Sequence, residues 1–174
     1  MTGPSQGEVW LQGPVPGVPP VLQPVAHGLL HAADQIRPAI DGLTSRQLTA
    51  RPQEIASIAF HVRHAIGSLD RLFTYARGES LSAIQREALA AEKAVDDPSV
   101  DVKSLLEALD GAVQRALDQL RKTDEASVFE HRAVGRAQLP STLLGLLFHG
   151  AEHTARHAGQ IVTTAKLVRG EPGV

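Results

Sequence analysis

The type of fold is most readily inferred from residues 140–168, PSTLLGLLFHGAEHTARHAGQIVTTAKLV. Apolar residues recur there at three- and four-residue spacing, which predicts one long amphipathic helix. Pro140 suits the first turn of such a helix, and Gly170 and Pro172 stand where helices often end. We therefore expect an all-α protein with this helix as a central element.

Three other segments have the same periodicity. We expect long helices over residues 20–40, 57–77 and 100–121, and a short connecting helix over residues 81–93. Ser57 is a suitable N-cap for the helix that follows it, and Pro38 should bend or end the first helix early. Asp96 and Asp97, followed by Pro98, should break the chain after the connecting helix. Four long amphipathic helices predict a four-helix bundle.

Two segments lack helical periodicity. Residues 1–19 are rich in proline and glycine and should form an extended arm ahead of a bundle domain at residues 20–170. We expect Trp10 in this arm to pack against the bundle, and the alternative is a free terminus. Residues 124–139 show no clear pattern, and we assign no element to them.

The composition excludes several kinds of site and partner. The 174 residues include no cysteine, so disulfides, thiolate metal sites and cysteine nucleophiles are absent. The net charge of −2 is spread along the chain without blocks, and we expect neither a nucleic-acid nor a membrane partner. Because neither a signal-like N-terminus nor a membrane-length apolar run is present, we expect a cytoplasmic protein.

Histidines form the clearest functional pattern. His149, His153 and His157 are four residues apart on the last helix, so neighbours differ by only about 40° in direction. His64 lies on a similar polar stripe of the helix at residues 57–77. If the two stripes face each other, His64, His153 and His157 can hold one divalent transition-metal ion, since imidazole suits zinc, nickel, iron and cobalt.

A competing motif overlaps these histidines. His149, Glu152 and His153 spell H-x-x-E-H, an inverted zinc-peptidase signature in which the glutamate is the general base. That class requires a further acidic ligand well downstream, but Glu171 is the only acid after His153 and lies beyond the helix. We therefore reject the peptidase interpretation.

Two segments also resemble a known family. EHTARHAGQI, residues 152–161, resembles the H-x-x-x-H-x-G-Q signature of the DinB-like (YfiT-related) superfamily, and SIAFHVRHAIGSLDRL, residues 57–72, resembles its second-helix motif. The resemblance implies an up-down-down-up four-helix bundle, often a homodimer, with zinc or nickel bound by His64, His153 and His157. The chain departs from the pattern in its proline-rich arm and in lacking the tryptophan that often opens the second-helix motif.

The resemblance also implies a range of activities. Members include metal-dependent transferases and isomerases that use low-molecular-weight thiols, and proteins described as hydrolases. We expect a metal-dependent enzyme of one of these kinds that acts on a small molecule, with a low-molecular-weight thiol as possible cosubstrate. The alternative is a non-catalytic protein, stabilised by its metal, that binds a partner or responds to stress.

Other side chains on the polar stripes have candidate roles. His61 and His149 lie one turn from the expected ligands and either orient a ligand, touch substrate or complete the coordination. Arg71 and Tyr75 share the stripe of the second helix and are candidates to recognise an anionic group, and Gln160 is a further candidate to contact a ligand. For Arg71 the alternative is a surface ion pair with Asp70 or Glu79.

Overall fold

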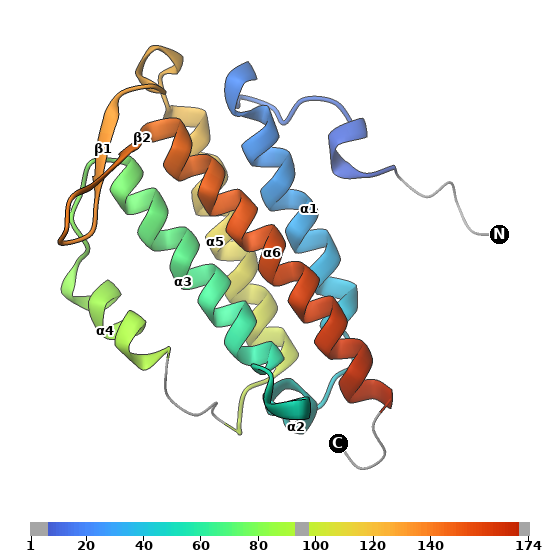
Figure 1. The fold of residues 1–174 in the computed structure, drawn as a ribbon. Coiled ribbons are helices and arrows are strands. Elements are labelled where there is room, and N and C mark those ends of the chain that lie inside the picture. Colours follow the sequence, from blue (N-terminus) through green and yellow to red (C-terminus); the bar gives the residue numbers. More distant parts are fainter. Residues whose placement is uncertain (1–6, 93–97, 171–174) are drawn as a thin grey trace.

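Four long helices form a bundle in the computed structural model, which describes residues 7–92 and 98–170 (Figure 1). They are α1 (Gln23–Ile40), α3 (Ile58–Ala76), α5 (Val102–Lys122) and α6 (Leu143–Gly170). Helices α1 and α6 run in one direction, and α3 and α5 run in the other. Helix α6 packs against α1 and α3, and α5 packs against the same two helices from the opposite side. The expected up-down-down-up four-helix bundle is therefore confirmed.

Short elements connect the bundle helices. They are α2 (Ser45–Thr49), α4 (Ala83–Ala91), strands β1 (His131–Val134) and β2 (Leu139–Thr142), and 3-10 turns at Val9–Leu11, Pro20–Leu22, Pro52–Glu54 and Glu125–Ser127. Because α3 and α5 are parallel neighbours, the chain must return along the whole bundle between them. Helix α4 lies in this return segment and packs against α3. It begins with a capping box in which Ser82 and Gln85 bind each other's backbone N–H groups.

The helix boundaries largely follow local sequence signals. Ser57 caps α3, with its Oγ accepting a hydrogen bond of 3.0 Å from the Phe60 N–H. We had expected Pro38 to end α1 early, but the helix continues to Ile40. Pro38 lies in the last turn, where only one backbone hydrogen bond is lost, and the fully buried Ile36 and Ile40 anchor this part of the helix. The expected break at Asp96 and Asp97 lies outside the described residues.

The start of the last helix corrects another prediction. Pro140 does not open α6 but lies in β2, opposite Ala133 of β1, and α6 begins at Leu143. A two-stranded sheet consists of edge strands, where a missing backbone N–H is tolerated. The Gly145 N–H donates to Thr142 Oγ1 at 3.0 Å and so anchors the first turn of α6.

The core is apolar and runs the length of the bundle. Its largest fully buried side chains come from all four long helices and include Leu29, Ile36, Val62, Leu109, Leu120, Leu147 and Ile161. Buried polar side chains also occur on α3 and α6, among them His61, Ser68 and His157. Within the described residues, no helix combines the length and apolar content needed to cross a membrane.

The N-terminal arm is attached to α1, but Trp10 does not pack against the bundle. Its side chain is 59% exposed, and the indole N–H donates to Glu8 within the arm at 2.6 Å. Gln23 fixes the arm instead, because its amide donates to the carbonyls of Val15 and Val18. The arm is therefore fixed both by these hydrogen bonds and by side chains, since Val18 is buried in the core and Val15 packs against it. The packing expected of Trp10 is wrong.

Candidate metal centre

Three imidazoles meet between α3 and α6. The Nε2 atoms of His64 and His153 are 3.1 Å apart, and those of His153 and His157 are 3.2 Å apart. Potential ligand atoms of all three residues lie within 4.8 Å of one another. The polar stripes of the two helices therefore face each other, which is the arrangement that a shared metal site needs.

The donor set fits a divalent transition-metal ion. Zinc–nitrogen bonds of about 2.0–2.1 Å in a tetrahedral site place ligand nitrogens roughly 3.3 Å apart, close to the two separations observed. Without an ion, each short nitrogen–nitrogen contact needs one nitrogen to carry a hydrogen and the other to offer its lone pair. An ion would use all three lone pairs together. Among the described residues, no fourth histidine or carboxylate belongs to the cluster.

Neighbouring groups orient two of the three rings through Nδ1. Glu92 Oε2 is 2.8 Å from His64 Nδ1, and His61 Nδ1 is 3.0 Å from His157 Nδ1. These contacts leave the Nε2 atoms of His64 and His157 directed at the centre. His153 Nδ1 is buried without a hydrogen-bond partner among the described residues. Unlike the other two, the His153 ring is held without a hydrogen bond at Nδ1.

The environment favours neutral imidazoles. Burial, followed by the neighbouring His153, lowers the pKa of His157 to about 4. Burial also lowers the pKa of His153 and of His61, with nearby His64 as the next cause in both cases. Since a metal ligand must be deprotonated, the lowered pKa values favour the metal-binding form of His153 and His157.

A cavity of about 360 Å³ adjoins the cluster. It is lined by His64, Ser68, Arg71, Leu72, Tyr75, Leu81, Leu89, His149 and His153. Tyr75, Leu81 and Leu89 also line a neighbouring cavity of about 520 Å³, which extends to Arg86 and Arg136. The histidine cluster therefore borders a space that continues beneath α4 towards the hairpin.

Comparison with known proteins identifies the family. A sequence model of the DinB superfamily matches residues 28–161, a range that includes all three clustered histidines. The chain belongs to the DinB superfamily. A crystal structure of a conserved protein from Enterococcus faecalis aligns with a TM-score of 0.69 and 18% identity, covering 87% of this chain and 98% of that one. At that identity the similarity supports the fold alone. No curated protein matches the chain.

In this DinB-superfamily protein, His61 and His149 have different surroundings. His61 is buried and contacts His157 on the side remote from the cluster, an arrangement that suits an orienting role. His149 is exposed, and its Nδ1 lies 3.4 Å from Glu152 Oε2. Glu152 itself accepts two short hydrogen bonds, of 2.6 and 2.7 Å, from Arg156. Because a surface arginine pairs with it, the Glu152 carboxylate is not placed to act as the general base of a peptidase.

Arg71 occupies a position that neither sequence interpretation anticipated. Its guanidinium donates to Glu92 Oε1 at 2.5 Å and to Ser68 Oγ at 3.1 Å, so Asp70 and Glu79 are not its partners. The ion pair is largely buried, with both side chains 11% exposed. Because Glu92 already balances its charge, Arg71 is a weak candidate for recognising an anionic substrate.

The two other residues predicted to contact a ligand, Tyr75 and Gln160, differ in their position relative to the cavities. Tyr75 lines both cavities, whereas Gln160 is exposed and lines neither.

Glu92 contacts the histidine cluster but was not predicted from the sequence. It stands at the end of the connecting helix, where nothing in the local spacing marks it as a neighbour of His64.

Proposed function

We propose that this DinB-superfamily protein is a metal-dependent enzyme acting on a small molecule. One divalent transition-metal ion, zinc or nickel, would be held by His64, His153 and His157. The observation that carries the proposal is the convergence of three nitrogens beside a cavity, with no fourth ligand in the cluster among the described residues. Three protein ligands and an open position are typical of catalytic zinc sites, whereas four protein ligands are typical of structural ones.

The chemistry needs both an ion and a shaped site. When bound, such an ion supplies Lewis acidity towards an oxygen or sulfur atom of substrate, thiol or water. His61 and Glu92 hold the rings of His157 and His64, and burial keeps the His157 imidazole neutral. Leu81 and Leu89 make part of the cavity wall apolar.

We further propose that the substrate or its thiol cosubstrate carries an acidic group. Arg86 and Arg136 line the cavity that continues from the histidine cluster, and neither has an ion-pair partner among the described residues. Arg86 donates to the Leu81 carbonyl, which still leaves other N–H groups of the guanidinium unused. An elongated molecule would thus place its reacting end at the histidines and its acidic end near these arginines.

An activity screen tests the enzyme proposal. Zinc- and nickel-loaded protein and protein treated with a chelator would be assayed for transfer of low-molecular-weight thiols to electrophiles and for hydrolysis of small esters and amides. We expect turnover that is lost on chelation and restored by metal. For acidic substrates, Arg136→Gln should raise KM while leaving kcat nearly unchanged, and neutral analogues should show no such effect.

A non-catalytic metal protein is the second candidate. One histidine comes from α3 and two come from α6, so a bound ion would cross-link the two helices and stabilise the bundle. Metal that raises the melting temperature but supports no turnover across the screen would favour this alternative over the enzyme.

A further inference from the structure

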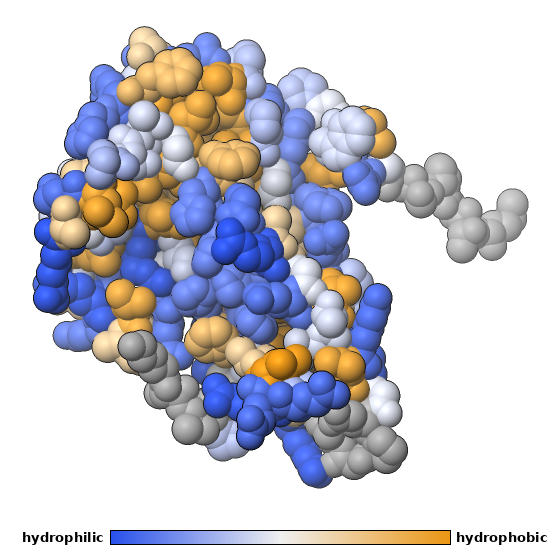
Figure 2. Space-filling view, viewed as in Figure 1, coloured by the Kyte–Doolittle hydropathy of each residue, from blue (hydrophilic) through white to orange (hydrophobic). Residues whose placement is uncertain are grey.

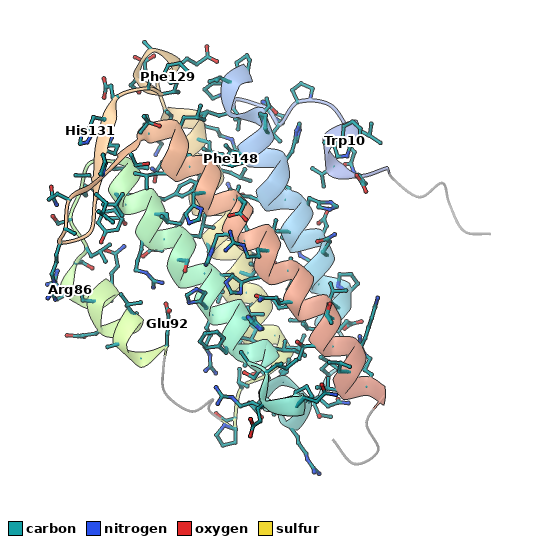
Figure 3. All side chains as sticks on the ribbon, viewed as in Figure 1. Trp10, Arg86, Glu92, Phe129, His131 and Phe148 are labelled. Atoms are coloured by element: carbon teal, nitrogen blue, oxygen red, sulfur yellow. The ribbon has the colours of Figure 1, made fainter. Side chains whose placement is uncertain are left out.

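The carboxylate of Glu92 reaches the bundle from outside it. Glu92 directly follows α4 (Figure 3). Its side chain is nevertheless only 11% exposed, and its Oε2 lies 2.8 Å from His64 Nδ1. Its other oxygen, Oε1, accepts a hydrogen bond of 2.5 Å from Arg71. A buried carboxylate is costly unless it is paired, and here the pairing is with one arginine and one imidazole.

Space for this carboxylate depends on Gly67. A Cβ atom at this position would lie 2.5 Å from Glu92 Oε1 and 2.8 Å from Arg71 Nη1. Gly67 stands one turn from both His64 and Arg71 on the same helix face. Glycine inside a helix is less favourable than alanine, but here it lets the acid approach His64.

Two contacts select the same tautomer of His64. A carboxylate only accepts hydrogen bonds, so Glu92 requires the hydrogen of the neutral ring on Nδ1. On the other side, Arg71 donates to Ser68 Oγ at 3.1 Å, which leaves the Ser68 hydroxyl hydrogen free for His64 Nε2 at 3.3 Å. Both contacts therefore leave the lone pair on Nε2, the atom that faces His153.

We infer that Glu92 is a positioning residue for His64, which it fixes as the Nδ1–H tautomer with Nε2 directed at the cluster. Helix α4 is then part of the site and not merely a connection between α3 and α5. Carboxylates that hydrogen-bond a ligand histidine fix its orientation and raise its basicity. The expected effect of Glu92 on metal affinity rests on the proposed metal function. The tautomer of His64 does not require metal.

Cobalt binding tests whether the contact between Glu92 and His64 strengthens metal binding. Metal-free wild type, Glu92→Ala, Gly67→Ala and the control Glu87→Ala would be titrated with Co²⁺ at pH 7.5, with binding followed by visible absorption. Loss of such a carboxylate typically weakens metal binding roughly 10–100-fold. We expect that loss for Glu92→Ala, a weakening in the same direction for Gly67→Ala, and no change for Glu87→Ala, because Glu87 is exposed on the same helix.

The Gly67→Ala variant distinguishes a loss of His64 positioning from a general loss of stability. Alanine favours the helix, so the melting temperature of the metal-free protein should hold or rise while cobalt affinity falls. A destabilised bundle would lower both quantities together. Circular dichroism melts of all four proteins supply this comparison.

Imidazole ¹⁵N shifts of His64 in metal-free protein at pH 7.5 test the tautomer directly. We expect the Nδ1–H form in wild type and in Glu87→Ala, and a mixture or the Nε2–H form in Glu92→Ala. A His64 tautomer unaffected by Glu92→Ala would overturn the inference. If wild type binds no cobalt, the proposed metal function fails, and the ¹⁵N shifts alone still decide whether Glu92 positions His64.

Discussion

The imidazole of His157 connects the chemistry of the site to the stability of the protein. Its pKa in the folded protein is about 4, against an ordinary value of 6.5, because the ring is buried beside other imidazoles. Between these two values the unfolded chain binds a proton that the folded protein does not. The free energy of unfolding of the metal-free protein should therefore rise with pH from about 4 to 6.5 and then level off.

Urea denaturation of metal-free wild type at half-unit pH steps checks this prediction. The contribution of His157 should be ~2 kcal/mol across the window, after allowance for solvent screening. His157→Gln should show a correspondingly smaller slope, since glutamine does not titrate. Identical slopes for the two proteins would contradict the pKa shift.

His61 should influence metal binding without being a ligand. It contacts His157 through Nδ1 at 3.0 Å, on the side remote from the cluster. His61→Ala should weaken metal binding roughly 10-fold without abolishing it, whereas the exposed His149→Ala should leave it unchanged. Competition with a chelator of known affinity measures both. Complete loss of metal in His61→Ala would instead make His61 a ligand.

The sequence was sufficient for some site residues and not for others. His153 and His157 must share a helix face because they are four residues apart, and a bundle brings that face towards the stripe containing His64. Glu92 could not be found in this way. Its contact with His64 depends on how α4 docks against α3, which no helical periodicity records. Glu92 also pairs with Arg71, which makes Arg71 a weak candidate for recognising substrate.

At the level of elements, the close packing of α3 and α6 sets the geometry of the site. A Cβ atom at Gly150 of α6 would lie 2.9 Å from the Phe73 ring and 3.3 Å from Leu69, both on α3. Gly150→Ala should therefore push the helices apart, with a destabilisation of about 1–3 kcal/mol from overpacking. It should weaken metal binding as well, because the ligands come from the same two helices.

Gly159→Ala is the matched control on α6. A Cβ atom there meets nothing within 4 Å, so the substitution should stabilise the helix by about 0.5–1 kcal/mol. Chemical denaturation of the two variants supplies the comparison. If Gly150→Ala proved as stable as Gly159→Ala, the packing of α3 against α6 would have room for the added methyl group, and the predicted overpacking would be wrong.

Helices were predictable here, and the short strands were not. Long amphipathic segments carry their periodicity over many residues, whereas β1 and β2 have four residues each and little apolar alternation. Pro140 was assigned to a helix start because proline suits both a first helical turn and an edge strand. Only the pairing of Pro140 with Ala133 distinguishes the two.

For the molecule as a whole, we propose a homodimer. Exposed apolar side chains gather at the hairpin end of the bundle (Figure 2), where Phe129, Leu139 and Phe148 are 76%, 60% and 57% exposed. Light scattering should give twice the monomer mass for wild type. Phe129→Ser combined with Phe148→Ser should give the monomer, and the exposed Ile84→Ser on α4 should not. A monomeric wild type would contradict the proposal.

If His64, His153 and His157 together hold one transition-metal ion, the purified protein should contain it. Elemental analysis of protein purified without a histidine tag should find about one equivalent of zinc or nickel in wild type. The ion should be lost in His64→Ala and in His153→Ala combined with His157→Ala. A wild type that stays free of metal even after reconstitution, or variants that retain the ion, would show that these three histidines do not form a metal centre.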